Sequence, residues 1–547
     1  MKKVVILAIN AKYIHTSLSA RVLAEGVSRY SKTAHEVIVI EANINQGFYD
    51  IADLVTAHNP VLVGISTYIW NAGMVTGLLK LFRSLMPETA LVPGGPEAAH
   101  NAEYWLEAGA DFVLQGEGEQ SFPALLDALA NKTSLNKIPG LCFKKDGLVF
   151  CNAEVKPSKS FITPDFESFS DELNGRIAYI ETSRGCPFSC AYCLSGGSEV
   201  KFLPLETAKE QIRKLAESNA KVIKFTDRTF NCSPKRAYEL FEYIIGLNTS
   251  RCFHFEAAAD LFDGRTIELL ATAPPGRIQF EIGLQSFFEP ALKAVCRQTD
   301  LTRAEENIRA LLSHQNIHIH IDLIAGLPLE TLSDFKNSFE RAYALNAHNL
   351  QLGFLKLLHG SKIREQNTSI VYSKEPPYEI ISSPWLSTSD LKMIKQAEDA
   401  LRNTYNKGRF LSTLRYIAGA AEIRPFALFQ TIGEAAPAYG VPLKYYAEQI
   451  YILCRKLKGV DEAQLRECMI YDWFRAVKYG DLPDFLKTGT NEQFKKVIKT
   501  AEITLGRKIR RNEAAVLPSG KGIFADSESR DPVTGLYEVQ FIGVINL

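Results

Sequence analysis

The 547-residue sequence predicts an α/β protein in three parts. These are an N-terminal doubly wound parallel sheet, a central partial (β/α)6 barrel and a mainly helical C-terminal domain. The first two parts are predicted because short apolar runs alternate with helix-like segments in residues 1–155 and again in residues 176–365. After residue 366, apolar residues recur mainly at helical spacing. The chain is also too long for one ordinary domain.

Residues 1–155 contain five strand-like apolar runs separated by helix-like segments. The predicted strands are residues 4–9, 37–40, 61–65, 90–92 and 111–114. The predicted helices are residues 17–30, 50–58, 72–85 and 102–108. This alternation is typical of an open, Rossmann-like parallel sheet with helices on both faces. Because ligands of such sheets bind at the carboxyl ends of the strands, we expect a ligand site at that edge.

Small and polar residues follow several of these strands at the expected ligand edge. Glycines there allow the backbone to approach a bulky ligand closely. The candidate ligand-binding residues are His15, Ser66, Thr67, Gly94, Gly95, Glu117 and Gly118.

A second set of alternating runs follows a polar stretch, residues 156–175, that is predicted to be a linker. The six predicted strands are residues 177–182, 222–227, 254–259, 278–284, 318–326 and 350–358. Six such repeats predict a partial barrel over residues 176–365. Barrels of this kind place their chemistry at the carboxyl ends of the strands.

Three cysteines follow the first of these strands in the segment RGCPFSCAYC, residues 184–193. Three thiolates on one short loop can bind three irons of a cubane cluster and leave the fourth iron open to a small molecule. A zinc knuckle or buried thiols would be the alternatives, but zinc needs a fourth ligand, and no other Cys or His lies beside the triplet. The predicted metal-binding and catalytic residues are therefore Cys186, Cys190 and Cys193.

This motif at the end of a strand resembles that of the radical S-adenosylmethionine (radical SAM) enzymes, in which SAM chelates the open iron of a 4Fe-4S cluster. By this resemblance, Asp227 lies near the SAM amino group, and Glu256 or Glu281 reaches the ribose hydroxyls. Three further residues would contact the carboxylate region of SAM, namely Gln285, Ser286 and Arg297. Each of these could instead be a polar group paired within the barrel core.

The first 155 residues resemble the cobalamin-binding domain that precedes the radical SAM domain in one large subfamily. The resemblance lies in the pieces GIST, PGGPE and GEGE, which begin at Gly64, Pro93 and Gly116. Many cobalamin folds carry D-x-H-x-x-G, whose histidine ligates cobalt, and this chain has no such motif. His15 is in about the right loop and is either a cobalt ligand or a loop-packing histidine. The alternative for the whole domain is a flavodoxin-like module with another ligand or none.

The C-terminal part, residues 366–547, is predicted to be mainly helical. A helix is expected after the N-cap Ser387 and before Gly408, and further helices over residues 443–457, 463–479 and 491–505. Residues 537–545 are expected to form a hairpin or edge strand. Five aromatic residues could line a pocket or, more simply, pack a core: Tyr445, Tyr446, Tyr451, Trp473 and Phe474. This part resembles an uncharacterised domain found after some cobalamin-binding radical SAM cores.

The remaining cysteines do not have cluster-like spacing and are expected to be buried thiols without a second cluster. They are Cys142, Cys151, Cys232, Cys252, Cys296, Cys454 and Cys468. Lys plus Arg and Asp plus Glu both number 62, which makes a nucleic-acid partner unexpected. Because no apolar run reaches the length of a membrane span, no membrane is expected, and the cysteine usage favours a cytoplasmic location.

The resemblance implies three cofactors: a 4Fe-4S cluster, S-adenosylmethionine and cobalamin. It also implies an external electron donor of the flavodoxin or ferredoxin type and a small-molecule or peptide substrate. The implied function is methylation of an unactivated carbon through a 5′-deoxyadenosyl radical and methylcobalamin. One alternative keeps both cofactors and replaces methylation with cyclisation or rearrangement. Another is a cobalamin- or redox-sensing binding protein.

Overall fold

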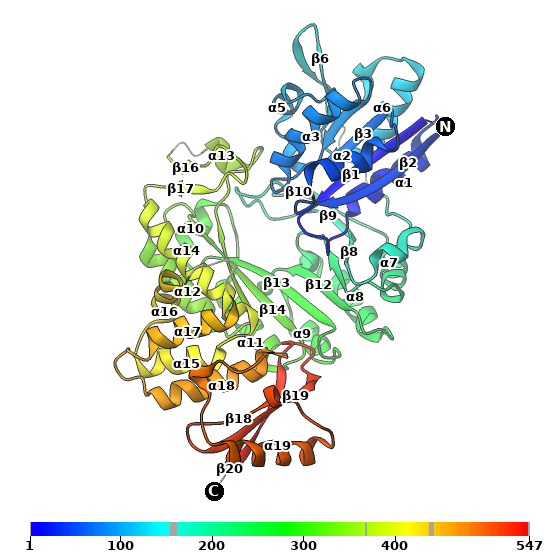
Figure 1. The fold of residues 1–547 in the computed structure, drawn as a ribbon. Coiled ribbons are helices and arrows are strands. Elements are labelled where there is room, and N and C mark those ends of the chain that lie inside the picture. The colour runs from blue at the N-terminus through cyan, green and yellow to red at the C-terminus, as the bar shows by residue number, and fades with distance from the viewer. Residues whose placement is uncertain (1, 154–160, 367–368, 437–441, 479, 545–547) are drawn as a thin grey trace. The chain divides into compact units, whose positions relative to one another are not determined.

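The structure, a computed structural model, describes residues 2–153, 161–366, 369–436, 442–478 and 480–544 (Figure 1). The chain forms two compact units. The first unit comprises Met1–Ala257, Val295–Gln298 and Leu355–Ile380. The second unit comprises Ala258–Ala294, Thr299–Phe354 and Ile381–Leu547. In the described part, no helix is both long enough and apolar enough to cross a membrane.

The first unit begins with a seven-stranded sheet of order β2-β1-β3-β4-β5-β6-β7. Its strands are β1 (Lys2–Asn10), β2 (His35–Asn43), β3 (Leu62–Ser66), β4 (Ala90–Gly94), β5 (Phe112–Leu114), β6 (Leu141–Lys145) and β7 (Leu148–Cys151). The five predicted strands are β1–β5, and they pair in parallel. The sequence prediction of a parallel sheet is therefore confirmed.

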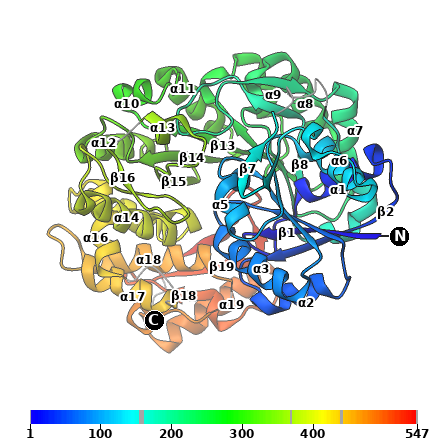
Figure 2. The same cartoon turned by 90° about the horizontal axis from the view of Figure 1, so that it is seen from above.

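Helices cover both faces of this sheet because alternate residues of β1 point to opposite sides. The helices are α1 (Leu18–Tyr30), α2 (Phe48–Thr56), α3 (Ala72–Leu85), α4 (Pro96–Ala99), α5 (Ala102–Glu107) and α6 (Gly118–Asn131). Val4 and Ile6 pack in one core with α1 and α6, whereas Val5 and Leu7 pack in another core with α2, α3 and α5. Figure 2 shows α1 and α6 on one side of β1 and α2 and α3 on the other.

An antiparallel hairpin, which the sequence did not predict, forms the far edge of the sheet. β6 pairs antiparallel with β5 and β7, and Cys142 on β6 lies opposite Cys151 on β7. These two cysteines form a disulfide. The expectation that all remaining cysteines are buried thiols is thus wrong for this pair, and it is also wrong for Cys296, which is exposed. Cys454 is a buried thiol, as expected.

The predicted linker, residues 156–175, is partly a packed element. Its first residues and the predicted boundary at 155–156 fall within 154–160, outside the described residues. The described remainder contains a 3₁₀ helix, Phe166–Leu173, in which Phe166, Phe169 and Leu173 are buried.

Three of the six predicted central strands lie in the first unit and three in the second. β8 (Ile177–Ile180), β11 (Val222–Phe225) and β12 (Cys252–Ala257) pair in parallel in the first unit, with helices α7 (Leu205–Glu217) and α8 (Pro234–Gly246) between them in sequence. β13 (Ile278–Gln285), β14 (His318–Ala325) and β15 (Asn349–Phe354) pair in parallel in the second. All six predicted strands are therefore present.

The rest of the central region comprises a short hairpin, further helices and two short strands. The cysteine segment begins on β9 (Ser183–Cys186) and ends before β10 (Ser198–Phe202), and these two strands form an antiparallel hairpin after β8. The other elements are α9 (Gly264–Ala271), α10 (Glu289–Ala294), α11 (Leu301–Ser313), α12 (Leu332–Tyr343), α13 (Lys362–Gln366), β16 (Val371–Tyr372) and β17 (Ile380–Ser382).

The C-terminal part is mainly helical, as predicted, and ends in a small sheet. Its elements are α14 (Thr388–Asn403), α15 (Leu411–Ala420), α16 (Pro425–Ala435), α17 (Leu443–Cys454), α18 (Glu462–Ala476), α19 (Asn491–Leu505), β18 (Ala514–Val516), β19 (Lys521–Arg530) and β20 (Tyr537–Val544). Ser387 caps α14 in a capping box with Asp390. The predicted ends at Tyr479 and Ile545 lie outside the described residues.

The aromatic residues of the C-terminal part mostly pack a core. Tyr446, Tyr451, Trp473 and Phe474 are buried, whereas Tyr445 is exposed. The core-packing interpretation is therefore confirmed for four of the five.

Candidate cluster and cofactor site

The three motif cysteines lie on one compact loop at the end of β9. Cys186 is 8% exposed and Cys190 6% exposed, while Cys193 is half-buried. Gly185 has a φ of +99°, and a Cβ there would lie 2.3 Å from the carbonyl oxygen of Glu199 on β10. Only glycine fits this position, so the residue before the first cysteine allows the tight entry into the loop.

The thiols of the loop lie close enough to affect one another's ionisation. Burial raises the pKa of Cys193, and the neighbouring Cys186 and Cys190 raise it further. Arg297 Nη1 donates a hydrogen bond to Cys190 Sγ over 3.6 Å, and the Thr229 hydroxyl lies 3.6 Å from Cys186 Sγ. A cation and a hydroxyl therefore face the sulfur atoms, which suits thiolate ligands.

The donor set of the loop, three cysteine thiols, fits a cubane cluster. The thiolates of a cubane bind to three different irons, so they need not meet at one point. The half-buried Tyr192 side chain, within the loop, interacts with Cys190 and with Arg297, so it packs beside this sulfur and its guanidinium neighbour.

Asp227 fixes the start of the cysteine segment. It lies just beyond β11 and is 1% exposed. Its Oδ2 accepts from the Thr182 N–H at 2.8 Å, and its Oδ1 accepts from the hydroxyls of Thr182 and Ser183 at 2.7 and 2.6 Å. Burial raises the pKa of Asp227 to about 6, although these three bonds favour the carboxylate. The carboxylate thus holds the two residues that precede the loop.

The other residues predicted to contact SAM are divided between the two units. Glu256 on β12 and Arg297 lie in the unit that carries the cysteines, and Glu256 is half-buried. Glu281, Gln285 and Ser286 lie on or just after β13 in the other unit. Ser286 is fully buried and donates to the Glu330 carboxylate at 2.5 Å, so its hydroxyl serves packing within that unit.

The carboxyl edge of the N-terminal sheet brings several predicted ligand-binding residues together. Thr67 is fully buried, and its N–H donates to the Gly94 carbonyl at 2.7 Å. Gly95 has a φ of +103°, and a Cβ there would lie 2.8 Å from the Thr67 carbonyl oxygen. The two loops, including the half-buried Ser66, therefore pack directly against each other.

An aromatic pair that the sequence analysis did not single out extends this edge. The rings of Tyr68 and Trp70 stack with centroids 4.2 Å apart and planes 8° apart. Trp70 is 47% exposed. A flat exposed aromatic surface at the ligand edge is suited to a large planar ligand.

His15 has structural partners in this structure. Its Nδ1 lies 2.7 Å from the Tyr179 hydroxyl on β8, and its backbone forms a bridge with Ile177. Burial, together with Lys12, Lys224 and Arg176, lowers the pKa of His15. These contacts favour the loop-packing interpretation of His15.

Five charged side chains connect the loop after β5 with the cysteine hairpin. Arg184 lies 2.7 Å from both Glu119 and Glu181 and 3.4 Å from Glu117, and Lys201 lies 2.7 Å from Glu117. Glu117 was predicted to bind the ligand, and Gly118 begins α6 beside it. Pair formation between residues 84 positions apart leaves no local pattern, so the sequence could not reveal this cluster.

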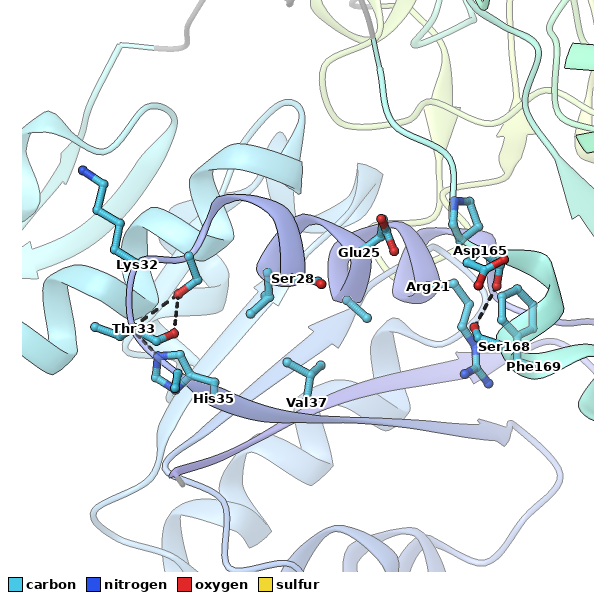
Figure 3. Close-up of a pocket in the computed structure, with 15 residues that line it drawn as sticks. Arg21, Glu25, Ser28, Lys32, Thr33, His35, Val37, Asp165, Ser168 and Phe169 are labelled. Atoms are coloured by element: carbon cyan, nitrogen blue, oxygen red, sulfur yellow. Dashed lines mark hydrogen bonds between the residues drawn. The ribbon is translucent and has the colours of Figure 1, made fainter. Parts of the chain in front are cut away.

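A hollow of about 590 Å³ contains none of the predicted site residues. It runs along α1 and the start of β2, and residues 164–169 close one end (Figure 3). Arg21, Glu25 and Lys32 line it with hydroxyl side chains. It is an open polar groove and is separate from the cysteine loop.

Three sequence-family models match the chain in order. The "B12 binding domain" matches residues 4–126, the "Radical SAM superfamily" residues 180–342, and "Protein of unknown function (DUF4080)" residues 366–516. The cysteine triplet lies within the second match. The loops of the sheet edge lie within the first.

Curated relatives match about half of the chain at low identity. TokK of Streptomyces tokunonensis, a cobalamin-dependent radical SAM methyltransferase, is 23% identical over 300 residues, which is 51% of this chain and 44% of TokK. The anaerobic magnesium-protoporphyrin IX monomethyl ester cyclase of Synechocystis sp. is 25% identical over 300 residues, which is 51% of this chain and 59% of the cyclase. The chain spans about half the length of the curated relatives it matches.

A solved structure shows the same fold over most of the chain. The cobalamin-dependent S-adenosylmethionine radical enzyme OxsB, with aqua-cobalamin and S-adenosylmethionine bound, matches with a TM-score of 0.60 and 12% identity. The match covers 94% of this chain and 82% of OxsB.

The order of the three family matches agrees with the order of the motifs along the sequence. Solved structures of similar fold contain the corresponding cofactors: TsrM of Kitasatospora setae has cobalamin and a [4Fe-4S] cluster bound, and OxsB has aqua-cobalamin and S-adenosylmethionine bound. The chain therefore has the domain order of the cobalamin-binding radical SAM family: a B12-binding domain, a radical SAM core and a C-terminal domain of unknown function.

Proposed function

We propose that this protein is a cobalamin-dependent radical SAM methyltransferase that acts on an unactivated carbon. One observation carries the proposal: three buried or half-buried thiols lie together beside a guanidinium, in the same compact unit as the B12-type sheet. The similarity to methyltransferases such as TokK supports methylation. When bound, the cofactors supply an electron, a 5′-deoxyadenosyl radical that removes hydrogen from carbon, and a transferable methyl group.

The chain's own residues hold these groups and exclude water. Cys186, Cys190 and Cys193 would hold three irons, and Arg297 offsets negative charge at Cys190. Asp227 keeps the start of the loop in place. The stacked Tyr68 and Trp70 would support cobalamin at the sheet edge. The reaction needs an external one-electron donor of the flavodoxin or ferredoxin type and a small-molecule or peptide substrate.

Anaerobic reconstitution with iron, sulfide and hydroxocobalamin tests the proposal. We expect about four irons per chain and a bound cobalamin spectrum. Cys186→Ala, Cys190→Ala and Cys193→Ala should each lose the cluster, whereas Cys296→Ala, which changes an exposed free cysteine, should keep it. Reduced enzyme should convert SAM to 5′-deoxyadenosine. Iron loading that survives all three motif substitutions would contradict the site.

Cyclisation or rearrangement is the second candidate, and the similarity to the magnesium-protoporphyrin IX monomethyl ester cyclase favours it. Product mass separates the two reactions, because methylation adds one carbon and cyclisation adds none. A cobalamin- or redox-sensing role predicts no turnover. Formation of 5′-deoxyadenosine under reducing conditions would exclude that role.

A further inference from the structure

The hairpin β9–β10 carries both the first motif cysteine and two cations that face each other. Arg184 lies opposite Lys201 across the two antiparallel strands, and Cys186 lies opposite Ser198. Like charges placed directly opposite each other destabilise a strand pair. The Lys201 side chain is only 8% exposed, so water does little to screen its charge. The hairpin therefore needs carboxylates from elsewhere.

The loop after β5 supplies two of these carboxylates. Glu117 Oε1 lies 2.7 Å from Lys201 Nζ and 3.4 Å from Arg184 Nη1, so one carboxylate bridges both cations. Glu119, in the first turn of α6, lies 2.7 Å from Arg184 Nη2. Glu117 and Glu119 belong to the B12-type sheet, and the hairpin belongs to the radical SAM core.

A third carboxylate fixes the orientation of Arg184 within the core. Glu181 accepts two hydrogen bonds from the Arg184 guanidinium, at 3.0 Å from Nε and 2.7 Å from Nη2. The Phe161 ring lies 4.8 Å from the same guanidinium carbon. Arg184 is therefore held on several sides before it meets Glu119, and its position follows that of the hairpin.

We propose that Glu117, Glu119, Glu181, Arg184 and Lys201 form an ionic clamp that couples cobalamin binding to cluster assembly. The inference rests on the cofactor sites proposed above. Cluster assembly fixes Cys186 at the end of β9, and this holds Arg184 and Lys201 in place. The two cations then hold the Gly116–Glu119 loop, at the cobalamin edge, in its binding conformation. By linkage, each cofactor must raise the affinity of the other by the same factor.

Cobalamin titrations of the full chain, with and without the cluster, measure this coupling. The wild-type chain is divided into a chelator-treated sample and an anaerobically reconstituted sample, and hydroxocobalamin binding is followed by absorbance. We expect the cluster-loaded sample to bind at least about fivefold more tightly, the lower end of typical coupling. This ratio of dissociation constants is the readout, and it does not require turnover.

Variants of the clamp should abolish the ratio without abolishing either site. Arg184→Met and Lys201→Met keep the apolar stems but remove the charges, and the ratio should fall to about one. Lys201→Arg retains the charge and should restore most of the coupling. Glu119→Gln, which is milder and lies outside the candidate ligand-binding residues, serves if Arg184→Met does not fold. The matched control is Arg213→Met, which removes a similar charge from an exposed ion pair with Glu210 and Glu217 on α7 and should leave the ratio unchanged.

The outcomes separate the clamp from the cofactor sites themselves. A wild-type ratio near one, or a ratio that persists in Arg184→Met, Lys201→Met and Glu119→Gln, overturns the clamp. A loss of the ratio in Arg213→Met as well overturns its assignment to these residues. Wild-type protein that binds no cobalamin in either state contradicts the proposed cofactor site, and the clamp is then overturned with it.

Discussion

The carboxylate of Asp227 shows how one side chain can fix the entry to the cysteine loop. Its two oxygens accept three hydrogen bonds from Thr182 and Ser183, four and three residues before Cys186. The resemblance to radical SAM enzymes had placed Asp227 near the SAM amino group. Its bonds in this structure assign it a role in holding the loop, whether or not it also faces SAM.

Substitution of Asp227 separates these two roles. Asp227→Ala would leave the buried N–H of Thr182 without its acceptor, at a cost of about 1–3 kcal/mol. We expect it to lower both the iron content after reconstitution and the urea midpoint of unfolding. Asp227→Asn retains an acceptor for Thr182 and should retain most of the iron. If Asp227→Ala keeps full iron content and loses only SAM binding, the loop-holding role is wrong.

Glu330 gives the second unit a pH-dependent stability. The side chain is fully buried, and its Oε1 accepts from Ser286 and Ser338, while its Oε2 has no hydrogen-bond partner among the described residues. Burial raises the pKa of Glu330 to about 7. The protonated form is therefore favoured by folding. Its stabilising contribution is complete below about pH 4.5 and is lost as the pH rises through 7.

Glu330→Gln removes this titration. As the pH rises from 5 to 8, wild type should lose stability that the variant keeps. The unfolding free energy of the variant minus that of wild type should therefore increase by up to about 3 kcal/mol over this range. Urea unfolding at pH 5, 6, 7 and 8 measures the difference. Glu289→Gln, at an exposed position of the same unit, is the control and should follow wild type at every pH. Parallel curves for Glu330→Gln and wild type would refute the raised pKa.

At the scale of elements, the carboxyl edge of β3 is the clearest candidate surface for cobalamin. The stacked rings of Tyr68 and Trp70 lie there, beside the packed loops of Thr67 and Gly95. Aromatic contacts of this kind contribute about 0.5–1.5 kcal/mol beyond their buried area.

Trp70→Ala should weaken hydroxocobalamin binding by up to about tenfold, which corresponds to about 1.4 kcal/mol. Trp70→Phe keeps a flat ring and should bind nearly as well as wild type. Tyr49→Ala, which removes a 72% exposed aromatic from α2, is the matched control. Absorbance titration gives the dissociation constants. Equal affinity for Trp70→Ala and wild type would exclude the stack from the binding surface.

The sequence predicted elements where the pattern was long and repeated, and it missed elements that depend on distant partners. The parallel strands β1–β5 and the six central strands coincide with apolar runs that are visible in the sequence. The hairpins β6–β7 and β9–β10 are antiparallel and lie outside the strand–helix alternation, so pairing rather than the repeated pattern defines them. The disulfide between Cys142 and Cys151 follows from that pairing, so it could not be foreseen.

The same limit applies to the candidate site. The cysteines are adjacent in sequence, and their spacing alone predicted one loop. The partners of His15 and Glu117 are 164 and 84 residues away, and only the fold brings them together. Local pattern therefore predicted that the three cysteines share one loop, but it could not tell which polar groups would be used in packing.

At the scale of the whole molecule, the two compact units are interleaved along the chain. The first unit takes Val295–Gln298 and Leu355–Ile380 from within the range of the second. Whether the predicted boundary at residues 365–366 separates parts that fold independently therefore has to be tested with a truncated chain. Within the second unit, helices beyond that boundary cover the strands and helices before it.

Two contacts show how strongly the C-terminal helices are joined to the core of the second unit. The Asn406 side chain accepts from the Leu350 N–H at 2.9 Å and donates to the Leu350 carbonyl at 2.8 Å, so it extends the edge of β15. Phe426 on α16 is 1% exposed, and its ring centroid lies 5.4 Å from that of Phe339 on α12. Loss of residues 366–547 would expose both the strand edge and this aromatic core.

We therefore expect the chain truncated at residue 365 to aggregate or to lack cooperative unfolding, even though a sequence-family boundary lies there. In the full chain, Phe426→Ala should lower the unfolding free energy by about 3–5 kcal/mol, because it leaves a cavity beside Phe339. Tyr445→Ala, at a 44% exposed aromatic on α17, should change it by about 0.5 kcal/mol or less. Size-exclusion chromatography and urea unfolding measure these outcomes. The prediction is wrong if the 1–365 fragment is soluble and unfolds cooperatively and if Phe426→Ala has only a mild effect. The core would then be stable without the C-terminal helices, and these helices would form an independent domain.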